Sequence, residues 1–283
     1  MRPRQHGRGE LVSLALAVAA LSAGCPSNLE QQSHVSKLRV LAVRVDPAEL
    51  ILDPDAGLPS ATLTALAVQA DGGPISVQFA LCTEITFAPS PTLPCPGDAG
   101  IELPESGPVS ALLDLSDPRI LAFARAAQLD GGFDAGGGIE STLDVGVPLL
   151  LGFTARADAQ RIDGFQTLTL RSPARGPADL NPELLDLQIG DGGPVAPGET
   201  VRLQPDAGPK DDPAKRYGYS FFATAGEISS LRSTDTTATG QAAETWVEWK
   251  APDAGGEVRF WVVVRDGRGG TAWIERATTV TPR

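Results

Sequence analysis

The sequence is poor in the side chains that most enzymes use for chemistry. It contains two histidines, His6 and His34, and His34 lies in a polar stretch near the N-terminus. Ser-His-Asp and Cys-His arrangements need a positioned imidazole, and catalytic zinc sites need several such ligands. There is no Gly-rich phosphate loop followed by Lys-Ser/Thr and no Gly-x-Ser-x-Gly elbow. The sequence therefore predicts a protein that is not an enzyme and that holds no metal and no cofactor.

Acidic side chains are in good supply, with 35 Asp and Glu in 283 residues. Two carboxylates suffice for a glycosidase, so a carboxylate-based carbohydrate-active enzyme is an alternative. Most of these residues, however, stand beside Pro or Gly in contexts typical of turns. The stretch Asp53-Pro54-Asp55-Ala56-Gly57 spaces two carboxylates as a calcium loop does, but it lacks a third oxygen ligand and a distal Glu. A turn is the simpler interpretation.

Basic residues are outnumbered, and the formal net charge is -12. Without residues 1–24 the chain keeps 20 basic and 34 acidic side chains, a charge of -14. No basic cluster is available to release counterions from phosphates. The composition excludes nucleic acid as a partner.

Long apolar runs are also missing. The longest, from Leu11 to Leu21, is about half the roughly 20 residues that a membrane-spanning helix needs. It follows three arginines and leads through Ser22-Ala23-Gly24 into Cys25, a pattern that resembles a bacterial lipoprotein signal. The resemblance implies a signal peptide at 1–24, lipidation of Cys25, a polar tether at 25–36, and a membrane-anchored protein of the cell envelope, at the outer membrane.

Cysteine is scarce, with three in the chain. Once Cys25 is assigned to lipid, Cys82 and Cys95 remain as a pair in an exported chain, and we expect them to form a disulfide. A metal site or a cysteine nucleophile would normally need histidine partners.

Turn residues are abundant, with 31 Gly and 24 Pro, which favours many short strands joined by loops. The pattern predicts a mainly β protein with two antiparallel sandwich domains, at 37–172 and 184–283, joined by a Pro-rich linker at 173–183. Ser116-Asp117-Pro118 opens the one expected helix, which is inserted in the first domain and ends before Asp130-Gly131-Gly132. The expected strands are 37–45, 61–70, 75–82, 147–157, 165–171, 184–189, 200–204, 217–224, 244–249, 258–265 and 271–280.

Residues 199–283 resemble bacterial Ig-like (PKD- or cadherin-like) surface modules. The resemblance lies in Gly198-Glu199-Thr200-Val201-Arg202-Leu203, Tyr217-Gly218-Tyr219-Ser220-Phe221, Trp249-Lys250-Ala251-Pro252 and Trp261 to Gly270. The block Leu38 to Val43, with Phe79-Ala80-Leu81-Cys82, is similar to the first domain of uncharacterised lipoproteins common in myxobacterial genomes. The resemblance implies Ig-like domains and a binding or structural module of the envelope. An accessory subunit of an envelope complex is the alternative.

All four tryptophans fall between residues 246 and 273. A hairpin closing on Asp266-Gly267-Arg268-Gly269-Gly270 pairs Arg265 with Thr271, Val263 with Trp273 and Trp261 with Glu275. Alternation then places Arg259, Trp261, Val263, Arg265, Trp273 and Glu275 on the face opposite the core. This face predicts a binding site formed by Trp261, Trp273, Arg259 and Arg265 for a glycan or an envelope protein. The alternative is that the arginines stack on the indoles or that the first domain covers them.

Overall fold

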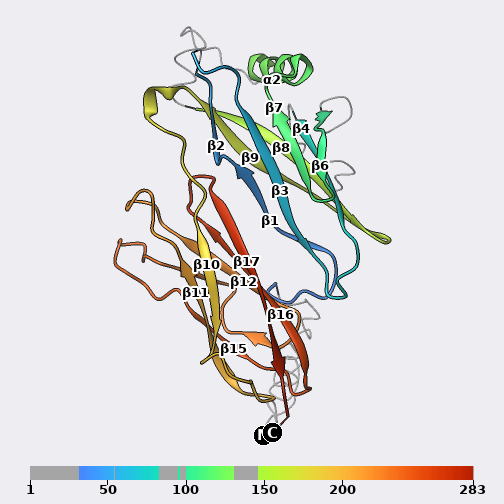
Figure 1. The fold of residues 1–283 in the computed structure, drawn as a ribbon, viewed down its shortest axis with the longest axis vertical. Coiled ribbons are helices and arrows are strands. Elements are labelled where there is room, and N and C mark those ends of the chain that lie inside the picture. Colours follow the sequence, from blue (N-terminus) through green and yellow to red (C-terminus); the bar gives the residue numbers. More distant parts are fainter. Residues whose placement is uncertain (1–31, 54, 83–94, 96–99, 131–145, 283) are drawn as a thin grey trace, which may run out of the picture. The chain divides into compact units, whose positions relative to one another are not determined.

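The computed structural model describes residues 32–53, 55–82, 95, 100–130 and 146–282 (Figure 1). The signal 1–24, the lipidation residue Cys25 and the Gly-rich segment 133–141 lie outside the described residues. From Gln32 onward the chain forms one compact unit. The described part is mainly β, with antiparallel sheets and one α-helix, so the predicted fold class is confirmed.

The N-terminal sandwich consists of two sheets whose inner faces share one apolar core. The first sheet has the order β1 (Arg39–Asp46), β3 (Ser60–Val68), β7 (Ser110–Asp114), β6 (Glu105–Gly107). The second has the order β2 (Glu49–Ile51), β9 (Gln160–Arg171), β8 (Val147–Ala157), β4 (Ser76–Cys82), β5 (Gly100–Glu102). Alternation explains the packing: Val77, Phe79 and Leu81 of β4 point inward, and Phe79 is 1% exposed, as expected of a central core residue.

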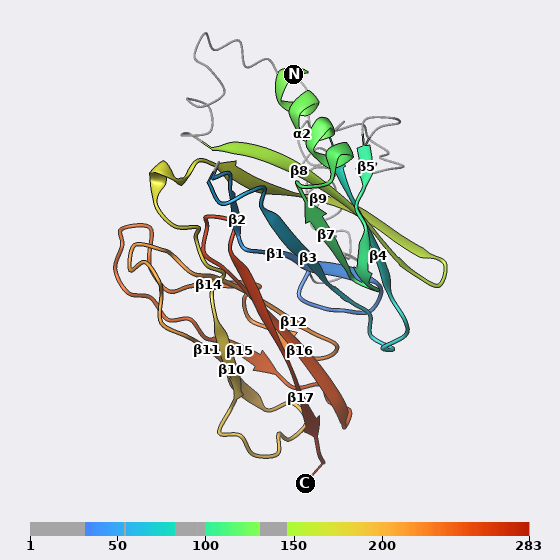
Figure 2. The ribbon, with the colours of Figure 1, turned by 45° about the horizontal axis from the view of Figure 1, so that its top comes forward.

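Helix α2 (Pro118–Asp130) covers one end of this core (Figure 2). Asp117 begins it, because its Oδ1 accepts a hydrogen bond from Arg119 N at 2.8 Å. Ile120 and Ala124, four residues apart on one face, are buried in the N-terminal core. The helix expected from Ser116-Asp117-Pro118 is therefore confirmed.

The C-terminal sandwich also encloses one core between two sheets. One sheet has the order β10 (Leu184–Ile189), β11 (Thr200–Ala207), β15 (Val247–Lys250), β13 (Glu227–Ile228). The other has the order β14 (Arg232–Thr234), β12 (Gly218–Ala223), β16 (Gly256–Arg265), β17 (Thr271–Val280). At the centre the Trp249 ring meets Phe260 edge to face at 4.8 Å, and its Nε1 donates to Ala225 O at 3.0 Å.

The strand order of both sandwiches is that of immunoglobulin-like domains. In the N-terminal sandwich β1, β3, β7 and β6 take the places of strands A, B, E and D, and β4, β8 and β9 those of C, F and G. After β1 the chain crosses from the first sheet to the second, where β2 pairs in parallel with β9. In the C-terminal sandwich the single bridge between Val195 and Val280 is likewise parallel. Both halves are thus Ig-like sandwiches by topology.

The structure adds the short strands β2, β13 and β14 to those expected, and β9 begins five residues earlier than expected. Two further segments differ from the expectation. Residues 100–110, expected to be loop-rich, form the short strands β5 and β6 and lead into β7, because backbone pairing with β4 and β7 orders a stretch with little apolar pattern. The expected tether at 25–36 ends earlier, because Val35 is fully buried and its N–H donates to Ala223 O at 2.8 Å. Ala223 N in turn donates to Ser33 O at 2.9 Å, so the chain adds a bridge to the end of β12 before it enters the N-terminal sandwich.

Candidate functional site: the covered tryptophan face and the clamped linker

The β16–β17 hairpin has the predicted register. Arg265 pairs with Thr271, Val263 with Trp273 and Trp261 with Glu275, without a bulge. The loop of five residues fixes this register, and the alternation of the strand then fixes the two faces. Val258, Phe260, Val262 and Val264 are buried in the C-terminal core, as predicted.

The opposite face of the hairpin packs against the N-terminal sandwich. Trp261 is 2% exposed and Val263 is fully buried. They belong to a third apolar cluster, here called the joint, which also contains Val35, Leu41, Ala42, Leu66 and Val68. A bulge in β1 between Val40 and Ala42 lets two consecutive residues, Leu41 and Ala42, lie on the outer face and enter the joint. Trp261 is therefore covered by the N-terminal sandwich, the arrangement that the sequence left as the alternative.

The other three residues of the predicted binding site lie around the rim of the joint. Trp273 is half-buried, with the Arg44 guanidinium 5.2 Å from the centre of its ring. Arg265 Nη2 donates to Leu41 O at 2.9 Å. Arg259 lies against Gly72 of the N-terminal sandwich and pairs with Glu257 at 3.1 Å. Because these side chains keep partial exposure, a binding role for them stays a prediction, whereas the Trp261 ring is closed to ligands.

The connection between the sandwiches, residues 172–183, is clamped at its beginning by a buried arginine. Arg171 Nε donates to Glu49 Oε2 at 3.0 Å, and its two terminal nitrogens donate to the carbonyls of Gly176 (3.0 Å) and Pro177 (2.6 Å). The same Glu49 oxygen accepts from Asp179 N at 3.1 Å. The guanidinium of Arg171 thus holds the first residues of the linker in a turn at the C-terminal end of β9.

Asn181 joins the two sandwiches directly. Its Nδ2 donates to Val45 O of β1 at 2.8 Å, and its Oδ1 accepts from Thr271 N of β17 at 2.9 Å. Both partners are backbone groups near the joint, which each need a hydrogen bond when water is excluded.

The far end of the linker is held by Lys215, whose side chain is fully buried. Its Nζ donates to Leu180 O and Asp211 Oδ2, both at 3.0 Å, and lies 3.1 Å from Asp266 Oδ2, an ion pair that is not aligned as a hydrogen bond. Asp266 Oδ1 accepts from the N–H groups of Arg268 and Gly270 in the β16–β17 loop. Burial opposes the charge of Lys215, but the hydrogen bond to Asp211 and the charge of Asp266 outweigh it and raise the lysine pKa.

The residues of this clamp were not predicted from the sequence. Its three aspartates, at 179, 211 and 266, stand far apart along the chain and in turn-like contexts, where solvated surface is the usual outcome. The one signal available is Lys215 itself, which follows Asp211-Asp212-Pro213-Ala214 at the spacing of a local ion pair.

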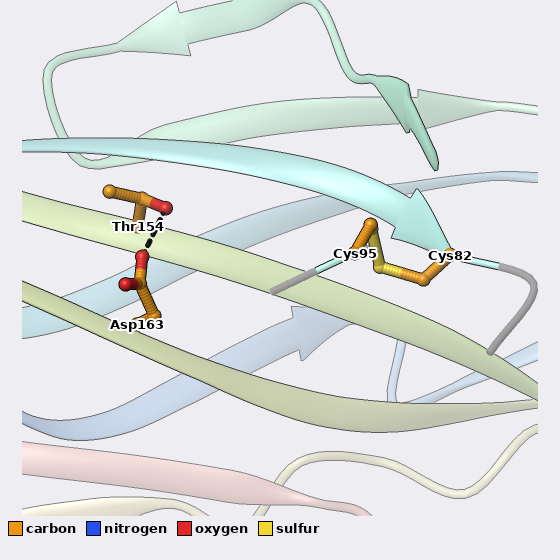
Figure 3. The surroundings of a disulfide bond; sticks show 4 residues. All are labelled: Cys82, Cys95, Thr154 and Asp163. Atoms are coloured by element: carbon orange, nitrogen blue, oxygen red, sulfur yellow. Dashed lines mark hydrogen bonds between the residues drawn. A yellow bond between two sulfur atoms is a disulfide. The ribbon is translucent and has the colours of Figure 1, made fainter. Parts of the chain in front are cut away.

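The disulfide between Cys82 and Cys95 is present, as the cysteine count predicts (Figure 3). It ties the end of β4 to the loop that follows, across a sequence separation of 13 residues. Gly100 of β5 packs on it so closely that a Cβ there would lie 2.7 Å from the Cys95 sulfur. Nearby on β8, Thr154 Oγ1 donates to Asp163 Oδ1 of β9 at 2.6 Å.

The carboxylates that the sequence offered for calcium form a turn. Asp53 Oδ1 accepts from Asp55 N at 2.9 Å, and Asp53 bridges to Gly57. In the described ranges no three His, Cys, Asp or Glu side chains come together as metal ligands. Among the helices of the same ranges, none has the length and apolar content to cross a membrane.

The solved structures that this chain matches include Ig-like and fibronectin(III)-like modules. One is the D0-D1 domain of intimin, at 11% identity over 86% of this chain and 99% of that chain, with a TM-score of 0.25. Fibronectin(III)-like modules of Clostridium thermocellum CbhA match at 13% identity, 86% and 94% coverage and a TM-score of 0.25. The Ig1-2 module of the Drosophila receptor protein tyrosine phosphatase DLAR matches at 10% identity, 87% and 99% coverage and a TM-score of 0.25. No family model matches the sequence, and a search of curated proteins finds no match.

Proposed function

We propose that this protein is a lipid-anchored surface protein of the bacterial outer membrane, in which two Ig-like sandwiches form one stiff binding or structural module. The observation that carries the proposal is the joint. An apolar cluster containing Trp261 joins the sandwiches, and Arg171, Asn181 and Lys215 hold the linker along its length. A chain built only to carry two independent domains would need none of these contacts.

The anchor rests on the sequence before the fold. Arg2, Arg4 and Arg8, the short apolar run and Cys25 support export and lipidation, and two or three acyl chains would make membrane residence effectively permanent. The compact unit that holds both sandwiches begins at Gln32, seven residues after Cys25 in the sequence. The module would therefore stand close to the membrane surface.

The test of the anchor is Cys25→Ser. The variant should lose labelling by radioactive palmitate and move from the membrane to the soluble fraction after a carbonate wash. The double variant Cys82→Ser/Cys95→Ser is the matched control, because it removes the other two cysteines and should stay labelled and membrane-bound. A Cys25→Ser protein that remains in the washed membrane would contradict the lipid anchor.

A second candidate is an accessory subunit of an envelope complex, favoured by the acidic charge of -14 on the chain without residues 1–24. Such a surface suits a basic partner protein. Crosslinking in intact cells followed by affinity purification separates the candidates. A stoichiometric partner supports the subunit, and its absence supports an independent surface module. The carboxylates of Glu49, Asp211 and Asp266 hold the linker or its clamp, which is a structural role.

A further inference from the structure

The outer edge of β17 carries a row of backbone groups that no described residue pairs. Hydrogen bonds at its two ends fix which residues face outward: Thr271 N donates to Asn181 Oδ1, and Thr281 N donates to Val195 O. Because strand backbone groups alternate in direction, the N–H and C=O groups of the odd-numbered residues between them also face outward. These residues are Trp273, Glu275, Ala277 and Thr279.

The pairing on the other side of the hairpin agrees. Arg259 of β16 exchanges hydrogen bonds with Thr224, beyond the end of β12, so the odd-numbered residues of β16 face β12. Its even-numbered residues then face β17 and pair there with even-numbered residues, such as Phe260 with Arg276. Within the described chain, the one hydrogen bond to the outward backbone groups of these four residues is from Arg276 Nη1, which donates to Glu275 O at 3.0 Å.

Neighbouring edges are protected in ways that β17 is not. Strand β10 lies beside β17 in the other sheet (Figure 1), but it has a bulge between Leu184 and Asp186, and Asp186 Oδ1 takes up the Leu187 N–H. Strands β13 and β14 are two and three residues long. Between Thr271 and Val280, by contrast, β17 has no Pro, no Gly and no bulge. Natural sheets normally blunt an edge of this length.

A groove of about 500 Å³ lies between β10 and this edge. Buried Leu187 and Pro205 are among its lining residues, so a side chain pointing into it from an added strand would meet apolar surface. Asp186, Asp206 and Glu275 surround the groove and the edge with negative charge, and Arg276 is already paired with Asp186 at 2.8 Å.

We propose that the β17 edge of the C-terminal sandwich binds an extended basic segment of a partner protein as an added β-strand. The backbone groups of Trp273, Glu275, Ala277 and Thr279 select a strand, because no other ligand matches alternating donors and acceptors at this spacing. The groove accepts an apolar side chain, and the carboxylate of Glu275, on the face of β17 opposite the core, selects Lys or Arg at the outward positions. This deepens the proposed binding function by naming the class of partner, and it does not depend on the lipid anchor.

Amide hydrogen exchange on the purified protein tests the open edge first. The amides of Ile274, Arg276 and Thr278, which face β16, should exchange slowly, and those of Glu275 and Ala277 should exchange at least about a hundredfold faster. Equal protection of the two sets would show that the edge is already covered and would overturn the proposal.

Displayed random 12-residue peptides, selected on the protein and counter-selected on Ala277→Pro, then test the partner. Proline removes the outward N–H and is tolerated on edge strands, whereas Ala277→Ser keeps the N–H and is the matched control. Selected peptides should be rich in Lys and Arg, slow the exchange of the Glu275 and Ala277 amides, and bind Ala277→Pro about tenfold or more weakly, but Ala277→Ser within about twofold. Equal binding to both variants, or peptides without basic residues, would overturn the proposal.

Two further measurements separate partner binding from a folding defect and from self-association. Should Ala277→Pro fail to fold, Glu275→Lys leaves the backbone intact and should weaken binding of the basic peptides about fivefold or more. Sedimentation velocity tests for a second copy of this chain at the edge. A dimer that Ala277→Pro dissociates would assign the edge to self-association and refute a basic partner. These assays use purified protein, so their failure leaves the anchoring result with Cys25→Ser unaffected.

Discussion

The Arg44 guanidinium of the N-terminal sandwich lies 5.2 Å from the centre of the Trp273 ring of the C-terminal sandwich. The contact lies beside Trp261 and Val263, which the outer faces of β1 and β3 bury completely or nearly so. The face of the hairpin that is richest in tryptophan is thus the surface through which the two sandwiches stabilise each other. The energetic predictions below follow from this joint and its clamps.

Replacing Trp261 with Ala should lower the free energy of unfolding by about 3–5 kcal/mol, because the change empties a closed apolar site. Trp261→Phe should cost about 1 kcal/mol, since the indole N–H has no hydrogen-bond partner among the described residues and only volume is lost. Trp246→Ala is the control, because Trp246 is half-exposed under Arg202 and should cost about 1 kcal/mol. Urea denaturation measures all three, and equal losses for Trp261→Ala and Trp246→Ala would contradict a buried joint.

Removing the Asn181 side chain should uncouple the sandwiches. Asn181→Ala leaves Val45 O and Thr271 N without partners, at a cost of about 1–3 kcal/mol. We expect calorimetry to show one unfolding transition for the wild type and two, or one broadened transition, for the variant. Leu180→Ala, next to it and 60% exposed, should leave the profile unchanged. A sharp single transition in Asn181→Ala at the wild-type temperature would show that the bridge does not couple the two halves.

The Lys215 clamp should contribute stability to the folded protein that is lost in strong acid and in strong base. Burial raises the pKa of Asp211, but the hydrogen bonds from Lys215 and Leu180 N outweigh it, and the pKa lies below its ordinary 3.8. The contribution of Asp211 is therefore present above that ordinary value and is lost as the pH falls through the lower folded value. The Lys215 pKa is raised above 10.5, so its contribution is complete below 10.5 and is lost as the pH rises through the folded value.

We therefore expect the wild type to melt above Asp211→Asn by a constant margin from about pH 5 to about pH 9, with the margin shrinking in stronger acid and stronger base. Melting temperatures across the pH range measure it. In a Lys215→Met background, the margin should no longer change in strong base, and its change in acid should be smaller, because only backbone hydrogen bonds to Asp211, such as that from Leu180 N, remain. A margin that persists unchanged at pH 2 would exclude the Lys215–Asp211 contact as its source.

The disulfide should stabilise the N-terminal sandwich. For a loop of this length, restriction of the unfolded chain by the disulfide adds about 3 kcal/mol to the free energy of unfolding. Denaturation of Cys82→Ser/Cys95→Ser should show a loss of that amount. The oxidised protein should have no alkylatable thiol at either position, as intact mass measured without reductant would show. Gly100→Ala should destabilise the oxidised protein more than the double serine variant, because the added methyl would lie 2.7 Å from both Cβ and Sγ of Cys95, and residue 95 can shift away only when the bridge is absent. Equal costs in both backgrounds would contradict that contact.

Strands and their register could be predicted from the sequence where a single local pattern determines them. The Phe79 strand and the β16–β17 hairpin follow from strict alternation between turn residues, and the five-residue loop alone sets the register of Trp261 against Glu275. Strands β5 and β6 are three residues long and rich in Gly, Glu and Ser, so no alternation marks them. These two segments become strands because their backbones pair with β4 and β7.

The site was harder to predict, for a related reason. The alternation of β16 places Trp261 opposite the core but does not say whether solvent or protein covers it. The cover comes from Leu41, which faces outward because of a bulge that has no sequence signature here. The Lys215 clamp and the Asn181 bridge likewise join groups that are brought together only by the arrangement of the two sandwiches. An aspartate in a solvated turn and an aspartate in the Lys215 clamp have the same sequence surroundings, so the sequence does not distinguish them.

The bridge between His34 and Ala223 also has a mechanical meaning. A pull on the chain at Gln32 reaches the C-terminal sandwich first, through the hydrogen bonds that Ala223 exchanges with Ser33 and Val35. These bonds belong to a parallel pairing, so a force along the strand loads them together in shear and does not open them one by one. Tension applied at Gln32 would therefore bypass the N-terminal sandwich until this bridge ruptures, and the first residues to extend would be those between Val35 and the start of β1.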